Sequence, residues 1–165
     1  MQFTLRPWTL DDLDSLVKYA NNPRVAQNLM NRFPHPYTEA NGKVFIGMAM
    51  GSTPANILAI EVEGAAAGGI GLHPLDDVYC KNAELGYWLA EPYWNKGIIT
   101  KAVLQMVDYG FKTFEIDRIF ARPFGTNNAS IRVLEKAGFL FEARFENTIY
   151  KNGEYFDELV YAVRR

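Results

Sequence analysis

The stretch that decides the fold is EPYWNKGIITKA, residues 91–102. It follows a segment that alternates like a strand, and it leads through a short turn at Gly97 into a segment with helical spacing of apolar residues. A turn that opens a helix presents backbone N–H groups without intrahelical partners, beside the positive end of the helix dipole. The stretch therefore predicts an anion site, and with it a ligand that carries phosphate.

The composition is that of one folded domain, which we expect over residues 1–165. Of the residues, 48% are hydrophobic and 14% are aromatic. No apolar run approaches the roughly 20 residues of a membrane span, and the first residues lack a signal-peptide pattern. The one cysteine, Cys80, excludes an internal disulfide and a cysteine metal cluster. We therefore expect a cytoplasmic protein that does not contact a membrane.

The charge and the motif inventory disfavour several classes of function. A formal net charge of −2 gives no broad basic field for nucleic acid, so we expect no nucleic-acid partner. Neither GxxxxGK[ST] nor GxGxxG occurs, which disfavours a nucleotide-phosphate enzyme. His35 and His73 have no ligand-like spacing, so we expect no metal.

Apolar periodicity and turn residues predict a mixed α/β or α+β layer fold. We expect a strand at residues 2–7, helices capped by Thr9, Asn22 and Thr38, strands at 57–62, 67–72 and 82–90, a long helix after Gly97, a strand at 118–123, a helix at 127–137 that Gly138 closes, and strands at 139–150 and 154–163. Between the last two strands, Asn152-Gly153 is a strong hairpin signal.

Three segments resemble the GNAT acyltransferases: NAELGYWL at 82–89, YWNKGIITKA at 93–102 and NNASIRVLEKAGF at 127–139. The chain is most similar to the group with the RimJ/RimL-type N-terminal acetyltransferases of ribosomal proteins, which KNGEYFDELVYAV at 151–163 also suits. The resemblance implies a mixed, mostly antiparallel central sheet, flanked by helices and splayed in the middle to admit acetyl-CoA. It also implies an enzyme that moves acetyl from acetyl-CoA to a primary amine by direct attack in a ternary complex.

The resemblance implies three sets of contacts to acetyl-CoA. Backbone N–H groups of the turn would hold the pyrophosphate: Asn95, Lys96, Gly97, Ile98, Ile99 and Thr100. The strand backbone at Trp88, Leu89 and Ala90 would pair with the pantetheine arm and polarise the thioester. Asn127 would bond the pantetheine amides, and Ser130 would lie near the sulfur. Taken by themselves, Asn127 and Ser130 read as a helix N-cap and a first-turn residue.

Two chemical steps need a proton carrier. A free alkylamine has a pKa of about 10, so it must lose a proton before it attacks. Glu84 is the expected base because it shares a strand face with Trp88, although it also reads as an ordinary exposed strand residue. Many GNAT enzymes have a tyrosine where this chain has Leu134, so protonation of the leaving thiolate falls to Ser130, to Tyr150 or to water.

The resemblance implies an acceptor site between the second helix, with its following loop, and the C-terminal hairpin. The expected lining residues are Phe33, His35, Tyr37, Tyr150, Tyr155 and Asp157, because aromatic walls and a carboxylate suit an ammonium group. A peptide N-terminus, a polyamine and an amino sugar all remain open as acceptors, and so do a monomer and a homodimer. The alternative function is an acetyl-CoA-binding sensor module that has lost turnover.

Overall fold

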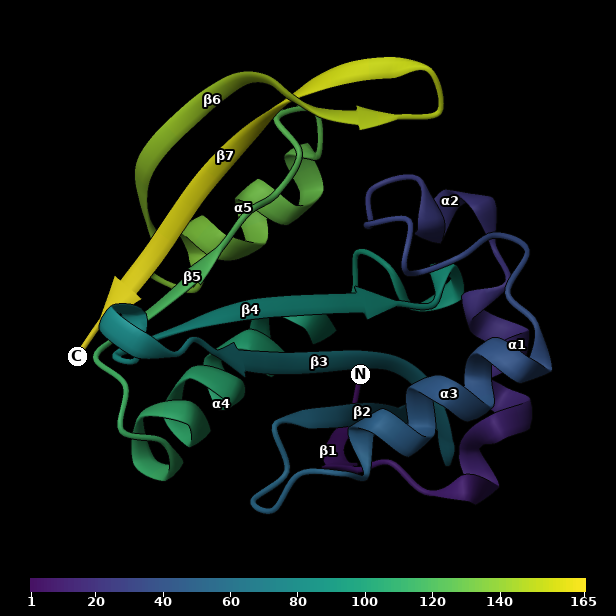
Figure 1. Cartoon of the computed structure of the whole chain (residues 1–165). Helices are drawn as coiled ribbons and strands as arrows, with labels where there is room; N and C mark the ends of the chain where they lie inside the picture. Colours follow the sequence, from purple (N-terminus) through teal and green to yellow (C-terminus); the bar gives the residue numbers. More distant parts are fainter. The chain divides into compact units, whose positions relative to one another are not determined.

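The helices and strands follow the predicted order (Figure 1), and the computed structural model describes all 165 residues. The strands are β1 (Thr4–Pro7), β2 (Ile57–Val62), β3 (Ala65–Pro74), β4 (Asn82–Leu89), β5 (Arg118–Ala121), β6 (Leu140–Lys151) and β7 (Glu154–Arg164). The helices are α1 (Leu13–Ala20), α2 (Pro23–Ala26), α3 (Glu39–Ala49), α4 (Ile98–Thr113) and α5 (Asn128–Lys136), with 3-10 turns η1 (Leu10–Asp12), η2 (Asp77–Tyr79) and η3 (Glu91–Tyr93).

The seven strands form one sheet in the order β1-β2-β3-β4-β5-β7-β6. The pair β4–β5 is parallel, whereas β1–β2, β2–β3, β5–β7 and β6–β7 are antiparallel. The prediction of a mixed, mostly antiparallel sheet with flanking helices is therefore confirmed. None of the helices combines the length and the apolar composition that crossing a bilayer requires.

The chain divides into two compact units, and each is described by itself. Unit 1 consists of Met1–Gly71 and Tyr87–Ala102, and unit 2 consists of Leu72–Gly86 and Val103–Arg165. Each unit is thus built from two separate segments, and β3, β4 and α4 contribute residues to both. One domain over residues 1–165 stays a prediction.

Polar caps begin the helices of unit 1 at the predicted residues. The side chain of Asn22 accepts a hydrogen bond from the backbone N–H of Arg24 at 2.9 Å, and Pro23 occupies the first helical position of α2. Thr38 Oγ1 accepts the backbone N–H of Asn41 at 3.2 Å at the start of α3. These local signals fix where α2 and α3 begin, and with them the loop between these helices.

Arg6 ties β1 to its two neighbours in unit 1. Its guanidinium donates to both carboxylate oxygens of Asp12, at 2.8 and 2.7 Å, and it also pairs with Glu61 on β2. The Asp12 carboxylate accepts the backbone N–H of Thr9 at 2.9 Å as well, as the predicted capping box requires. The hydrogen bonds from Arg6 hold the pKa of Asp12 below its ordinary value.

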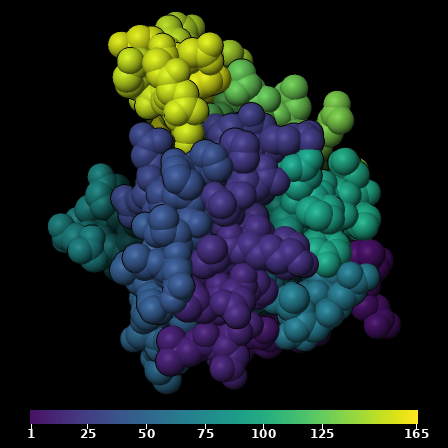
Figure 2. All heavy atoms as spheres, turned by 90° about the vertical axis from the view of Figure 1, so that its right-hand side faces the viewer, coloured from purple at the N-terminus to yellow at the C-terminus, as the bar shows by residue number.

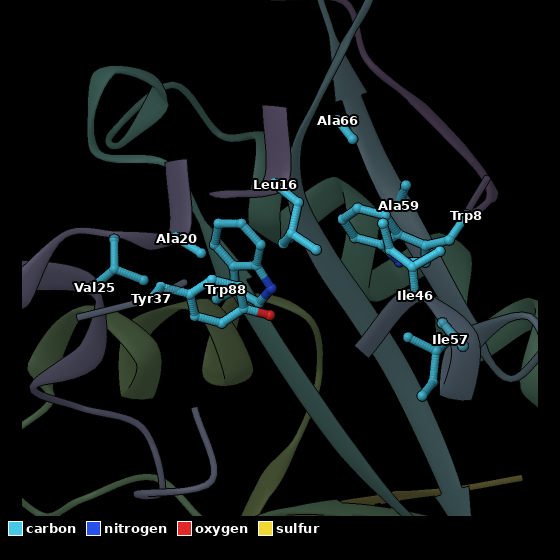
Figure 3. Close-up of a cluster of buried hydrophobic side chains, with 11 residues drawn as sticks. Trp8, Leu16, Ala20, Val25, Tyr37, Ile46, Ile57, Ala59, Ala66 and Trp88 are labelled. Carbon is cyan, nitrogen blue, oxygen red and sulfur yellow. The ribbon is translucent and has the colours of Figure 1, made fainter. Parts of the chain in front are cut away.

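The apolar faces of unit 1 meet in one buried cluster (Figure 3). Its members come from the helices, the strands and the loops: Trp8, Leu16, Ala20, Val25, Tyr37, Ile46, Ala49, Ile57, Ala59, Ala66 and Trp88. The helices α1 and α3 pack closely because Gly42 has no side chain; a Cβ there would lie 2.8 Å from Leu13 Cδ1. In Figure 2 the atoms of α1 to α3, coloured purple to blue, form one continuous surface.

The core of unit 2 lies among β3, α4, β5 and α5. Gly110 allows α4 to approach the sheet, because a Cβ at this position would lie only 2.4 Å from Leu72 Cδ1. Helix α5 ends at Gly138, which has a φ of 87°, and the N–H of Phe139 donates to the carbonyl of Leu134 at 3.0 Å. This is the glycine-closed end that the sequence predicts.

The strands β6 and β7 form the predicted hairpin. Asn152 and Gly153 both have positive φ, 52° and 79°, as a two-residue turn between right-twisted strands requires. The register places Tyr150 opposite Tyr155, and it shifts twice along β6, between Phe141 and Ala143 and between Phe145 and Ile149. The hairpin is thus bulged on its outer strand.

Candidate functional site

The turn before α4 has the backbone shape of an anion-binding loop. Asn95 and Gly97 have φ values of 59° and 75°, and asparagine is one of the few non-glycine residues that adopt this conformation readily. The first helical hydrogen bond of α4 runs from the N–H of Lys101 to the carbonyl of Gly97, at 3.3 Å. None of the backbone N–H groups of residues 95–100 donates to another group of the chain. Six consecutive donors at a helix N-terminus suit a phosphate-bearing ligand.

The access to these donors is open at the turn. Asn95, Lys96 and Gly97 are exposed, and a Cβ at Gly97 would meet no atom within 4 Å. Ile98 is buried and anchors the first turn of α4 in unit 1. Ile99, which stands where the family often has a smaller residue, is only partly exposed. The six residues that the sequence predicts for pyrophosphate are therefore adjacent, and their backbone N–H groups have no partner in the chain.

Two aromatic side chains anchor the segment that leads into this turn. The indole Nε1 of Trp94 donates to the carbonyl of Leu89 at 2.7 Å. The hydroxyl of Tyr93 donates to Glu63 Oε2 at 3.1 Å. The end of β4 is thereby fastened to the start of the turn, and Trp94 acts as an anchor of this segment.

At the end of β4, only some of the predicted strand donors are available. The N–H of Ala90 donates to the carbonyl of Ala67 at 2.8 Å. Because successive N–H groups of a strand point to opposite edges, the N–H of Leu89 points away from β3. The ladder between β4 and β5 covers only Asn82–Glu84 opposite Arg118–Phe120, so Leu89 lies beyond its end.

The N–H of Ala90 is paired with Ala67, so the predicted contact of the Ala90 backbone with the ligand does not use this donor and stays a prediction. The side chain of Trp88 belongs to the buried cluster of unit 1, and two glycines on β3 make room for this residue. A Cβ at Gly68 would lie 2.5 Å from the carbonyl oxygen of Trp88, and a Cβ at Gly69 would lie 2.9 Å from its Nε1. Of the three predicted strand residues, Leu89 is the one whose N–H faces the edge away from β3.

In unit 1, two residues that are predicted to line the site of the acceptor amine lie beside Trp88. The ring of Phe33 lies 5.1 Å from the ring of Tyr37 and 5.4 Å from that of Trp88. Figure 3 shows Tyr37 and Trp88 in the same buried cluster. Burial raises the pKa of Tyr37 to about 12, so its phenol is neutral at physiological pH. His35 is exposed on the loop between them.

In unit 2, the predicted base Glu84 is held by an arginine that sequence reasoning missed. Arg122 donates from Nε to Glu84 Oε1 at 2.9 Å and from Nη2 to Oε2 at 3.0 Å. A second carboxylate, that of Glu158, is also near: its Oε1 lies 3.6 Å from Arg122 Nη1. The hydrogen bonds to Glu84 raise the pKa of Arg122. The pairing uses one lone pair on each oxygen, so the Glu84 carboxylate can still accept a hydrogen bond from the acceptor amine or a water.

Helix α5 carries the other predicted catalytic and cofactor residues. Asn127 is its N-cap: Oδ1 accepts the N–H of Ser130 at 3.2 Å. The carboxamide still has two N–H donors on Nδ2, so capping and a ligand contact are compatible. Ser130 is partly buried. Leu134 is fully buried, so no hydroxyl occupies the position where the family often has tyrosine.

The hairpin residues predicted for the acceptor have structural partners instead. Asp157 Oδ1 accepts the N–H of Asn147 at 2.9 Å, and Oδ2 accepts Nε of Arg144 at 2.8 Å. These hydrogen bonds, first from Asn147 and then from Arg144, lower the pKa of Asp157. Asp157 therefore braces the bulged hairpin, and its predicted contact with an ammonium group stays a prediction. The rings of Tyr150 and Tyr155 contact each other at the exposed tip, with centroids 4.9 Å apart and planes inclined at 46°. No three His, Cys, Asp or Glu side chains gather as a metal site would require.

Comparison with known proteins identifies the family. The chain matches the family model of the acetyltransferase (GNAT) domain over residues 2–140. YdaF of Bacillus subtilis (strain 168), named a putative ribosomal N-acetyltransferase, is 38% identical over 101 residues, which cover 61% of this chain and 55% of YdaF. The chain thus spans about half the length of the first curated relatives that it matches.

Solved structures share the fold along nearly the whole chain. An acetyltransferase of the GNAT family from Bacillus anthracis has a TM-score of 0.84 and 25% identity, covering 99% of this chain and 95% of its own. RimL, a ribosomal L7/L12 alpha-N-protein acetyltransferase solved with coenzyme A, has a TM-score of 0.87 at 19% identity, covering 99% of this chain and 94% of its own. The predicted RimJ/RimL-like resemblance is confirmed, and the chain belongs to the GNAT acetyltransferase family.

Proposed function

We propose that this protein is an N-acetyltransferase that moves acetyl from acetyl-CoA to a primary amine by direct attack in a ternary complex. The observation that carries the proposal is the row of backbone N–H groups of residues 95–100, which have no partner in the chain. These backbone donors, with the dipole of α4, would hold the pyrophosphate. Asn127 would contribute its Nδ2 donors to the amides of the pantetheine arm.

Leu89 would supply the electrostatic part of catalysis. Its N–H, which points away from β3, would donate to the thioester carbonyl and then to the oxyanion that forms when the amine attacks. One preorganised donor of this kind contributes about 2.7–4 kcal/mol in other enzymes. Trp94 supports the role because it fixes the Leu89 carbonyl at 2.7 Å and so orients the strand end.

Glu84 would take the proton that the ammonium acceptor must lose. The nitrogen of the neutral amine then bonds to the acyl carbon and the carbon–sulfur bond breaks. The second proton that the nitrogen loses passes to the leaving thiolate through Ser130 or water, so that coenzyme A leaves as the thiol. Phe33 and Tyr37 would line the amine side, where aromatic rings favour a cation. The proposed acceptors are a peptide N-terminus or a small amine, and a screen of both that follows thiol release selects between them.

A Glu84→Gln variant tests the proposal. Turnover should fall at least about 100-fold, the usual contribution of a general base, while the dissociation constant of acetyl-CoA stays within twofold. Glu158→Gln is the matched control, because it removes the other carboxylate beside Arg122 and should leave turnover nearly unchanged.

The alternative is a sensor module that binds acetyl-CoA without turnover. The burial of Leu134 and the pairing of Glu84 with Arg122 motivate it. Binding of acetyl-CoA by the parent protein, with no transfer to any peptide, polyamine or amino sugar, would favour the sensor. Absence of binding would contradict both functions.

A further inference from the structure

Glu91 lies between the end of β4 at Leu89 and the turn of residues 95–100, which we call the cofactor turn. It is the first residue of η3, and both of its carboxylate oxygens bind the segment around α2. Oε2 accepts Nδ2 of Asn22 at 2.8 Å, and Oε1 pairs with Nη1 of Arg24. A side chain four residues before the turn of residues 95–100 is therefore fastened to a helix far away in the sequence.

Arg24 reaches the same turn a second time. Its guanidinium lies over the ring of Trp94, 5.5 Å from the ring centroid, while Trp94 holds the carbonyl of Leu89. The charged group thus sits between the Glu91 carboxylate and an indole, and it contacts both ends of the short segment 91–94. Such a clamp restricts the direction in which the chain enters residues 95–100.

The other side of the clamp leads to the predicted acceptor residues. Asn22 caps α2, and its neighbour Asn21 accepts the backbone N–H of Tyr37 at 3.0 Å. The ring of Tyr37 contacts Phe33, which in turn contacts Trp88. The segment 21–37 therefore meets the end of β4 on both sides of Leu89, once at Trp88 and once at Glu91.

We propose that Glu91 is a positioning residue that couples the acceptor-side segment 21–37 to the cofactor turn 95–100. The inference rests on the proposed function, and it assigns to Glu91 no contact with either substrate. With the pyrophosphate bound at the turn, the clamp would hold the aromatic residues of the loop in the orientation that receives the amine.

Because the Arg24–Glu91 pair is exposed, its loss should affect binding without a large effect on folding stability. The side chains of Arg24 and Glu91 are 64% and 30% exposed, and ion pairs so exposed contribute little to folding. Variants at Glu91 should therefore unfold cooperatively at nearly the parent's temperature. The pair Lys43–Glu39 on α3 provides a matched control, since it is also an exposed ion pair of unit 1, at 3.0 Å.

The test compares Glu91→Ala, Glu91→Gln and Glu39→Ala. The dissociation constant of coenzyme A is measured by calorimetry, and the KM of the acceptor and kcat are measured with acetyl-CoA. Glu91→Ala should raise both the dissociation constant and the acceptor KM about tenfold, with kcat within threefold of the parent. Glu91→Gln, which keeps an acceptor for Asn22, should recover part of both losses, and Glu39→Ala should change neither.

Three results would overturn the inference. Equal values for Glu91→Ala and the parent would remove the role, and a loss in coenzyme A affinity alone would remove the coupling. The same losses in Glu39→Ala would indicate a general effect of removing surface charge. If Glu91→Ala does not fold, the same three comparisons apply to Glu91→Gln. A parent protein that binds no coenzyme A would instead contradict the proposed function.

Discussion

A pair of glycine substitutions separates the backbone cost of the cofactor turn from its function. Gly97 and Gly64 have nearly the same conformation, with φ values of 75° and 80°, and a Cβ on either would meet no atom within 4 Å. Both belong to unit 1, but Gly64 lies in the turn between β2 and β3. Each change to alanine places a side chain in a left-handed conformation without a clash, so the two variants carry the same strain.

The expected loss of stability is small and equal. Left-handed backbone costs a non-glycine residue about 1–2 kcal/mol, and the reduced entropy of the unfolded chain returns about 0.4–1 kcal/mol. A net loss of about 1 kcal/mol corresponds to a Tm lowered by about 2–4 °C for a chain of this size. Thermal unfolding followed by circular dichroism checks this for both variants.

The effect on coenzyme A should differ between them. Relaxation of Gly97→Ala away from positive φ would turn N–H groups of residues 95–100 from the pyrophosphate. One hydrogen bond to a charged group contributes about 1.5–3 kcal/mol, so its loss weakens binding by about 10- to 150-fold. Gly64→Ala should bind coenzyme A like the parent. Equal dissociation constants for the two variants in a calorimetric titration would refute the assignment of the turn.

Three further predictions concern the scaffold. Asp12→Asn should lower Tm at neutral pH. Because Arg6 depresses the pKa of Asp12, the parent's advantage is complete above the ordinary value of 3.8 and should shrink as the pH falls below it; an advantage that grows below pH 3.8 in a Tm–pH series would contradict this. Gly68→Ala should cost about 1–3 kcal/mol, measured by urea unfolding, because its Cβ would lie 2.5 Å from the Trp88 carbonyl; a neutral result would mean that β4 shifts freely. Trp94→Phe keeps the ring but loses the donor to Leu89, so Tm should fall by about 2–4 °C, and an unchanged Tm would show that the hydrogen bond does not anchor the turn.

Most of the fold could be predicted because its signals are local. The caps at Asn22 and Thr38, the glycine end at Gly138 and the turn at Asn152-Gly153 each act within a few residues. Their positions set the boundaries of the helices and of the hairpin, and the apolar periodicity set the order between them. The turn at Gly97 belongs to the same class, because a helix start leaves its own donors unpaired.

The details of the site depend on contacts between distant segments, which periodicity does not encode. Arg122 holds Glu84 from 38 positions away, and Arg144 with Asn147 engages Asp157 across the hairpin. Neither partner follows a spacing rule, so Glu84 and Asp157 both looked free in the sequence. The hydrogen bond from Ala90 to Ala67 could have been anticipated only from the exact pairing of β3 with β4.

The alternation of β4 constrains how the length of this strand can change. An insertion or deletion of one residue between Glu84 and Leu89 would exchange the amides on the two edges, and a donor meant for the acyl group would then face β3. A change of two residues would restore the directions but move the donor by about 6.5–7 Å along the strand. Under the proposed function, changes meant to admit other acyl groups are therefore better directed at side chains around Leu89 than at the length of β4.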